Sequence, residues 1–417
     1  MNRDISYYFF GEQRFLDSAA RRSEGHVRTG DKVATVRILI APDKFKGALN
    51  AREVGENIAK GLRDVIPDVD IDILPMADGG EGTAKAICEA RGGSWLKCKA
   101  HDPLGREIEA RYAWIENGKL AVMEMSEAAG LWRRSEDERD PIRATTFGVG
   151  EMIRDAAKGG ARQIIIGLGG SATNDGGFGM ARAMGFRFFS GARELKGDVS
   201  ELENLTKIEL TSVAGLSALT SKMQPARLPL QVKIIAAVDV RNSLLGENGA
   251  TRVFGPQKGA TEDKVGILEP ALARLADVVA NEFGFDYRDT PGAGAAGGLG
   301  FGLMTFCDAT IRPGFDVVAE AVELESRMKD ADFIITGEGS LDRQTLEGKT
   351  PSGVAKLARK LGKKVFAMVG RVSGDAEVRR IFDGVYQNAR PDMSEKENMQ
   401  RAAELLRENA RELAQRL

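Results

Sequence analysis

The chain has 417 residues, 42% of them hydrophobic, so it can bury a large core and, at about 150 residues per domain, form two or three domains. Its 59 Lys and Arg residues nearly balance 61 Asp and Glu residues, which excludes the broad positive field of a nucleic-acid-binding protein. Three cysteines fit neither a disulfide framework nor a zinc site, and no apolar run approaches the roughly 20 residues of a membrane span. We expect a cytoplasmic protein with no nucleic-acid or membrane partner.

Residues 1–35 differ from the rest of the chain. They combine arginines with the aromatic group Tyr7–Phe10 and show no sustained periodicity. A targeting peptide would be poor in acidic residues, yet Asp4, Glu12 and Asp17 lie here. We predict a poorly ordered extension or a start codon placed too far upstream.

The regular part of the chain opens with a βαβα pattern. Val36–Ala41 is a short β-branched run typical of a strand that is buried on both faces. Asn50 followed by Glu53 resembles a capping box, and the helix that it starts carries an apolar residue every four positions. A second strand at Ile71–Leu74 and a helix from near Glu81 follow, which implies parallel strands joined by right-handed crossovers.

Further elements follow in the middle and at the end of the chain. Residues 95–125 alternate as in a hairpin, with turn signals at Asp102-Pro103 and Asn117-Gly118. An amphipathic helix spans Val265–Val279. The other expected elements are strands within 163–189 and 231–239, Phe333–Thr336, Val365–Val369 and Val385–Gln387, a helix at Ser352–Leu361, and one long helix capped by Ser394.

This order predicts an α/β protein in which a second α/β domain is inserted into the first. The outer domain would comprise residues 36–93 and 313–417 as a five-stranded doubly wound parallel sheet, and the inserted domain residues 94–312. Ligands of such sheets bind beyond the carboxyl ends of the strands. The loops expected there are PDKFKGAL, MADGGEGT and GEGSLDRQT.

These loops contain what a phosphoryl-transfer site needs, namely cations for the phosphates, acids for magnesium, and a group that orients the attacking hydroxyl. Lys44 and Lys46 follow the first strand as candidate phosphate ligands, although two solvated surface lysines would look the same. Asp78 and Glu81 flank a Gly-Gly pair where backbone can approach a ligand closely. Asp78 could instead cap the following helix, or do both.

The loop GLGGSATNDGG could hold an anion on its backbone N–H groups, with Ser171, Thr173, Asn174 and Asp175 as candidates. It lacks the Gly-Lys-Ser/Thr of a Walker A loop and the pattern of a dinucleotide fingerprint, so alone it is a weak signal. The run PGAGAAGGLGFG is better explained by close helix packing than by ligand binding.

Other candidates come from strand ends and the late loop. Asp239 ends an apolar strand, and Lys258 and Arg312 are cations in neighbouring loops. Only two histidines are present, which makes a Ser-His-Asp hydrolase improbable. The late loop, GEGSLDRQTLEGKTPSGV, gathers acids and hydroxyls among glycines: Glu338, Ser340, Asp342, Thr345 and Lys349.

Read in order, APDKFKG, PMADGGEGT, GLGGSATNDGG, FGPQKGAT, GAGAAGGLG and TGEGSLDRQT…GKTPSGVA resemble the type I glycerate kinases, from about Val36 to Gly370. The resemblance implies a flavodoxin-like domain interrupted by a second α/β domain, and the phosphorylation of D-glycerate by ATP with Mg²⁺, with the 2-position favoured as the acceptor. Lys44, Asn174, Arg241 and Ser340 depart from the residues usual at their positions in this family.

Within this interpretation, the candidate roles divide into three groups. Asp239 or Asp175 would accept the hydroxyl proton, with Lys46 as the third catalytic residue. Glu338, Asp342 and Asp78 would organise magnesium. Substrate or phosphate would be held by Lys44, Asp78, Glu81, Ser171, Asn174, Lys258, Arg312, Ser340 and Thr345. Two alternatives remain at this point, a non-catalytic flavodoxin-like binding or regulatory protein and a hydroxy-acid dehydrogenase.

Overall fold

The computed structural model describes residues 35–117, 119–210, 232–373 and 376–417. The prediction for residues 1–35 therefore lies outside the described residues apart from Thr35. Val36–Leu417 form one compact unit, and in its described part no helix is both long enough and apolar enough to cross a membrane. All three cysteines are buried and free.

The first sheet has five parallel strands in the order β14-β13-β12-β1-β2. Counted along the chain, this order is 2-1-3-4-5, which is the order of flavodoxin-like sheets. The predicted α/β class with parallel strands is confirmed. The strands span Arg37–Pro42 (β1), Asp70–Ile73 (β2), Phe333–Leu341 (β12), Lys364–Val372 (β13) and Gly384–Gln387 (β14).

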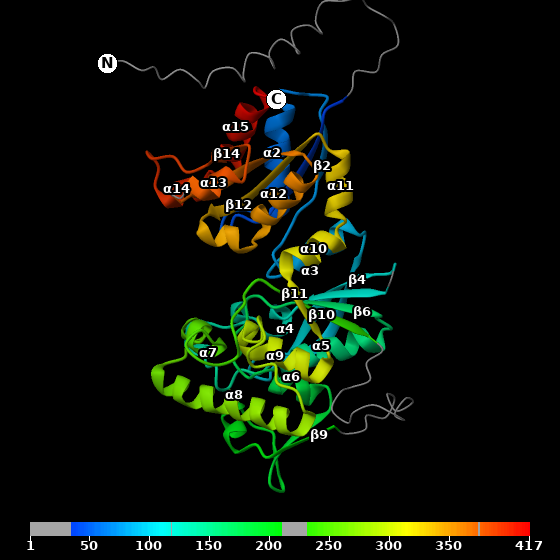
Figure 1. Cartoon of the computed structure of the whole chain (residues 1–417), viewed down its shortest axis with the longest axis vertical. Helices are drawn as coiled ribbons and strands as arrows, with labels where there is room; N and C mark the ends of the chain where they lie inside the picture. Colours follow the sequence, from blue (N-terminus) through cyan, green and yellow to red (C-terminus); the bar gives the residue numbers. More distant parts are fainter. Residues whose placement is uncertain (1–34, 118, 211–231, 374–375) are drawn as a thin grey trace, which may run out of the picture. The chain divides into compact units, whose positions relative to one another are not determined.

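Helices cover both faces of this sheet because its strands are apolar on both sides. Ile38 and Ile40 of β1 pack with α2 and α15, which Figure 1 shows side by side, while Leu39 and Ala41 pack toward α12. The predicted capping box of α2 forms, since Asn50 and Glu53 bond to each other's backbone N–H. The helices that contact this sheet are α2 (Ala51–Arg63), α11 (Leu324–Asp330), α12 (Thr350–Lys360) and α15 (Ala402–Ala414). Two others, α3 (Thr83–Ala90) and α10 (Gly314–Ala321), contact the second sheet, and α13 (Ala376–Arg380) and α14 (Glu395–Gln400) lie near the C-terminus.

The second sheet has six strands in the order β11-β10-β6-β5-β4-β3. Its β3-β4-β5 part is antiparallel, as the alternation in residues 95–125 predicted, and the rest is parallel. The strands span Ser94–His101 (β3), Glu107–Ile115 (β4), Leu120–Glu124 (β5), Gln163–Gly167 (β6), Lys233–Val238 (β10) and Thr310–Pro313 (β11).

A separate three-stranded antiparallel sheet and several helices pack against this second sheet. Its strands are β7 (Phe186–Ser190), β8 (Arg193–Leu195) and β9 (Lys207–Leu210). The helices are α4 (Ser126–Ala129), α5 (Phe147–Lys158), α6 (Phe178–Ala183), α7 (Ala250–Phe254), α8 (Glu262–Phe283) and α9 (Ala295–Cys307). Short 3₁₀ turns occupy Leu131–Arg133, Glu136–Glu138, Val199–Asn204, Pro256–Lys258 and Arg343–Glu347.

The two larger sheets share one hydrophobic core. Ile165 and Ile235 of the second sheet belong to the same buried cluster as Leu39 and Ile334 of the first, with Ile87 of α3 in the same cluster. This continuity explains why residues 36–417 form one unit. The division into domains at 93/94 and 312/313 stays a prediction.

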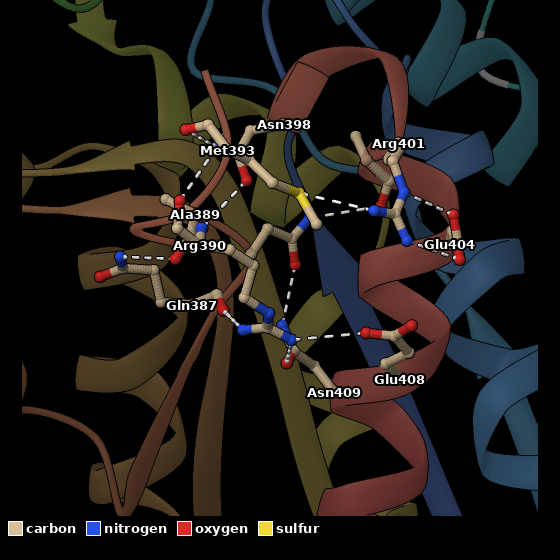
Figure 2. Close-up of polar contacts among 11 residues, drawn as sticks. Gln387, Ala389, Arg390, Met393, Asn398, Arg401, Glu404, Glu408 and Asn409 are labelled. Atoms are coloured by element: carbon tan, nitrogen blue, oxygen red, sulfur yellow. Dashed lines mark hydrogen bonds and ion pairs between the residues drawn. The ribbon is translucent and has the colours of Figure 1, made fainter. Parts of the chain in front are cut away.

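The C-terminal helices are fixed by a polar network that Figure 2 shows. The Arg390 guanidinium donates to the Gln387 carbonyl (2.8 Å) and to Asn409 Oδ1 (3.2 Å), and so ties the end of β14 to α15. Ser394 caps α14 as expected, but the predicted single helix is two helices, because the chain turns at Arg401. Only α15 buries apolar residues against the sheet, so packing sets its direction independently of α14.

Candidate active site

Four carboxylates follow or end strands of the two parallel regions, and we call Asp43, Asp78, Asp239 and Glu338 the acid cluster. Asp43 follows β1, Asp78 lies beyond β2, and Glu338 lies near the end of β12, so these three belong to the first sheet. Asp239 follows β10 of the second sheet. The carboxyl ends of strands from both sheets therefore supply one group of acids, where α/β proteins bind ligands.

Close backbone contacts between glycines bring the loops together. A Cβ atom on Gly79 would lie 2.7 Å from the Gly314 Cα and 3.1 Å from the Ala237 carbonyl carbon at the end of β10. A Cβ atom on Gly314 would lie 1.7 Å from the Asp78 carbonyl oxygen. Only glycine fits at either position, and Gly79 also has a positive φ of 98°. The Gly-Gly pair of MADGGEGT thus lets the Asp78 loop pack closely against the second sheet.

The carboxylates of the acid cluster influence one another. Burial, and then the negative charge of Asp78, raises the pKa of Asp43 to about 6. Asp239 is partly open to water. Its pKa is raised too, first because the surrounding protein partly desolvates the carboxylate and then because of the negative charge of Asp78. Asp78 therefore lies within electrostatic reach of both Asp43 and Asp239.

Glu338 is buried and held by the late loop. It accepts a hydrogen bond of 2.7 Å from Thr345 Oγ1, and Thr345 Oγ1 accepts one of 3.1 Å from the Asp342 N–H. Burial is the main cause that raises the pKa of Glu338 to about 7, and the negative charges of Asp43 and Asp342 raise it further. The sequence prediction that these late-loop residues lie together agrees with this geometry.

Two lysines balance part of this negative charge. The positive charge of Lys44 lowers the pKa of Asp43 and of Asp239, and that of Lys349 lowers the pKa of Glu338 and of Asp239. The Asp43 carboxylate also accepts a 2.8 Å hydrogen bond from the Thr350 hydroxyl at the start of α12. Carboxylates, two ammonium groups and a helix N-terminus together suit a phosphate ester and its counter-ion.

A cavity of about 880 Å³ adjoins the acid cluster. Asp43 and Lys44 line it on the side of the first sheet, and Ser126, Trp132 and Gly170 line it on the side of the second. This volume lies within the range of about 300–1,000 Å³ that small-molecule sites occupy.

The second sheet also fixes the start of α3. Glu124 at the end of β5 accepts hydrogen bonds from the N–H groups of Gly82 (2.9 Å) and Ala84 (3.1 Å). The alternative that Asp78 caps this helix is wrong, because the N-cap is Gly82 and Asp78 accepts from Gly80 N–H within its own turn. Glu81 is exposed, and its carbonyl accepts a hydrogen bond from Lys44 Nζ.

The glycine loop GLGGSATNDGG contains buried residues that serve the fold. Asp175 is 1% exposed, and its two carboxylate oxygens accept four hydrogen bonds, from Thr146 N–H and hydroxyl and from Gly177 and Gly179 N–H. Such a carboxylate has no open position for a substrate proton. Asn174 is fully buried, with its amide donating to Thr251 Oγ1. Ser171 is also buried, at a bridge with Gly130.

Lys258 is buried in this same region. It is 1% exposed, and its Nζ donates to the Thr173 carbonyl at 2.8 Å. Burial lowers its pKa to about 7, against the opposing effect of Asp175. Its contacts connect the FGPQKGAT turn with the glycine loop.

Three more candidates have no described contact with the acid cluster. The Lys46 side chain is exposed, and its backbone nitrogen lies 3.3 Å from where a Gly339 Cβ would be. Arg312 donates to Glu320 at 2.7 Å. Ser340 accepts from Arg371 at 3.2 Å.

Sequence reasoning missed Asp43, Thr350, Glu124 and Trp132. Asp43 could have been found, because it stands directly after the first strand in PDKFKGAL. The other three depend on contacts between distant segments, which no local pattern records.

The donor set fits Mg²⁺ held together with phosphate oxygens. Among the described residues, no group of three or more His, Cys, Asp or Glu side chains is arranged to hold a metal ion alone. Mg²⁺ in kinases is usually held by one or two carboxylates, substrate phosphates and waters. The acid cluster offers hard oxygen ligands whose mutual repulsion a divalent cation would relieve.

Comparisons with known proteins identify the family of this chain. Residues 38–417 match the model of the glycerate kinase family. The chain is 42% identical over 380 residues to the glycerate kinase of Halalkalibacterium halodurans, covering 90% of this chain and 97% of that one. It is 40% identical over 344 residues to the glycerate 2-kinase of Escherichia coli, covering 82% and 87%.

A solved structure gives the same result. A crystal structure from Salmonella typhimurium LT2, provisionally assigned as glycerate kinase 2, superposes with a TM-score of 0.78 at 38% identity. The match covers 92% of this chain and 98% of the other. The kinase motifs, the α/β fold and these comparisons agree, and the chain belongs to the glycerate kinase family.

Proposed function

We propose that this kinase transfers the γ-phosphoryl group of ATP, with Mg²⁺, to D-glycerate, and that the product is 2-phosphoglycerate. The observation that carries the proposal is the close packing of the Asp78 loop, through Gly79, against the end of β10, which brings Asp78 within electrostatic reach of Asp239 at one site. The 2-position is supported by the 40% identity to the Escherichia coli glycerate 2-kinase. Neither the dehydrogenase nor the non-catalytic alternative agrees with membership of a kinase family.

Asp239 is our candidate for the group that accepts the hydroxyl proton. It is open to water and within electrostatic reach of Asp78 and the two lysines, whereas Asp175 is buried and saturated with hydrogen bonds. A raised pKa makes the carboxylate a better proton acceptor near neutral pH. Of the two proton acceptors that the sequence left open, Asp239 and Asp175, we therefore propose Asp239.

Glu338, Asp342 and Asp78 are our candidates for organising Mg²⁺, with Asp43 added. When bound, Mg²⁺ would offset the charge of the transferred phosphoryl group. Lys44 and Lys349 would hold phosphate oxygens, and their positive charges offset part of the negative charge of the acid cluster. Lys46, whose side chain is exposed, remains a candidate for the same role.

A coupled assay of ADP release tests this function. The purified chain would be given MgATP and a panel of hydroxy acids, and the product would be identified by phosphorus NMR. We expect turnover with D-glycerate and a phosphomonoester at C2. Turnover with another acid in place of glycerate, or a 3-phosphate product, would contradict the corresponding part of the proposal.

A further inference from the structure

The cavity beside the acid cluster contains an aromatic side chain that the phosphoryl-transfer chemistry does not use. Trp132 is 64% exposed, more than any other large hydrophobic side chain in the described residues. Small-molecule sites are commonly lined by aromatic side chains, so an exposed indole that lines a cavity is a candidate ligand contact. Trp132 lines the same cavity as Asp43 and Lys44, so it lies where a ligand of the acid cluster would extend.

Trp132 is held in one orientation although it is exposed. Its indole Nε1 donates to the Ser126 carbonyl at 3.0 Å. A Cβ atom on Gly130 would lie 2.7 Å from that nitrogen, so the ring rests against glycine backbone. The preceding residue, Leu131, donates its N–H to the Gly170 carbonyl at 2.8 Å, which anchors the segment to the glycine loop.

An arginine covers one face of the ring. The Arg133 guanidinium carbon lies 4.3 Å from the Trp132 ring centroid, and Arg133 Nε donates to the Glu127 carbonyl at 2.7 Å. Trp132 and Arg133 both line the cavity, and the 64% exposure of Trp132 leaves the ring face opposite Arg133 open to a ligand. A fixed aromatic face, stacked from behind by a cation, suits a planar and electron-rich ligand.

We propose that Trp132 is the stacking platform for the adenine base of the phosphoryl donor, with Arg133 behind it and Lys44 on the side of the phosphates. The inference rests on the proposed function only in taking the donor to be an adenine nucleotide. Glycerate has no planar ring that could stack, so this part of the cavity belongs to the donor rather than to the acceptor. The site is thus divided, with the base at the second sheet and the phosphates at the acid cluster.

Calorimetric titration measures the contribution of the base to binding separately from that of the phosphates. Wild type, Trp132→Leu, Trp132→Phe and the control Trp114→Phe would each be titrated with ADP and with inorganic tripolyphosphate, both with Mg²⁺. Trp114 is a partly buried indole bonded to Glu116 and does not line the cavity. Base stacking on an aromatic ring predicts that Trp132→Leu weakens ADP binding roughly fivefold to 150-fold and leaves tripolyphosphate binding unchanged.

Trp132→Phe should keep part of the affinity for ADP, and Trp114→Phe all of it. In a Trp95→Phe, Trp114→Phe background, Trp132 is the one remaining tryptophan of three, and ADP but not tripolyphosphate should quench its fluorescence. Equal ADP affinity in wild type and Trp132→Leu would overturn the platform, as would an equal loss for both ligands. A chain that binds ADP through Trp132 but does not phosphorylate glycerate would overturn the proposed function alone. A wild-type chain that binds no ADP would overturn both.

Discussion

Asp78 and Asp239 belong to loops of different sheets, and the negative charge of Asp78 raises the pKa of Asp239. The two loops come together because Gly79 lets the Asp78 loop pack against the end of β10. Like charges held at one place cost stability unless a ligand or ion compensates them, and functional sites are where such arrangements gather. This electrostatic coupling is the reason for placing phosphoryl transfer where the loops of the two sheets come together.

Asp239→Asn tests the proposed proton acceptor. The amide keeps the size of the side chain but cannot accept the proton, so we expect kcat to fall by about 10²–10⁴ with little change in the KM for glycerate. Steady-state kinetics with ADP detection measures both constants. Asp175→Asn is the comparison, and its main effect should be on the melting temperature, because Asp175 holds four hydrogen bonds in the core. Near-native turnover in Asp239→Asn would remove Asp239 from the mechanism.

Lys44→Met and Lys46→Met form a matched pair. The sequence favoured Lys46, but Lys44 lines the cavity and acts on two acids of the cluster, while Lys46 is exposed. Removing a charged partner from a desolvated anion costs about 2–5 kcal/mol, so Lys44→Met should lower kcat/KM for MgATP well over tenfold. Lys46→Met should have the smaller effect. The reverse order would return the phosphate role to Lys46.

Glu338→Gln tests the buried acid through pH. Because the pKa of Glu338 is raised to about 7, from an ordinary value of 4.5, the folded state binds its proton more tightly than the unfolded state does. The resulting stabilisation is complete below pH 4.5 and is lost as the pH rises through 7. Without nucleotide or magnesium, the unfolding free energy of wild type relative to Glu338→Gln should fall by about 3 kcal/mol between pH 4 and pH 8. Urea denaturation measures this difference, and a flat difference would refute the buried, protonated state.

Lys258→Met tests the burial of the Lys258 ammonium, for which the stability should change with pH in the opposite direction. The pKa of Lys258 is lowered from 10.5 to about 7, so between these values the unfolded state binds more protons and wild-type stability rises with pH. Relative to Lys258→Met, the wild-type unfolding free energy should rise by about 2 kcal/mol between pH 7 and pH 9. The solvent-exposed Lys60→Met serves as control. A wild-type chain that gains nothing over Lys258→Met in this range would show that Lys258 is not buried.

The sequence correctly predicted those elements whose pattern lies entirely within one short segment of the chain. The capping boxes at Asn50 and Ser394 and the alternation of β3, β4 and β5 depend on neighbours in the chain or on one face of a strand, and all of them form. The single C-terminal helix was wrong because the turn at Arg401 depends on where α15 packs. Burial of that kind is decided by segments far away in the sequence.

The site was predictable to the extent that it follows strand ends. Asp78, Asp239 and Glu338 are acids at or beyond the ends of strands, and their positions in the motifs pointed to them. The same rule selected Asp175, whose carboxylate instead accepts hydrogen bonds from Thr146 and from the start of α6. A motif locates a carboxylate near a loop, but only the surrounding donors decide whether it is free for a substrate.

A double-mutant cycle on Asp78 and Asp239 tests the central claim most directly. The kcat/KM for D-glycerate with MgATP would be measured for wild type, Asp78→Asn, Asp239→Asn and the double variant. If one site uses both carboxylates, each single variant should lose at least about 100-fold, and the double variant should lose far less than the product of the two losses. Near-native activity in both single variants, with glycerate still phosphorylated, would contradict a phosphoryl-transfer site between the two sheets.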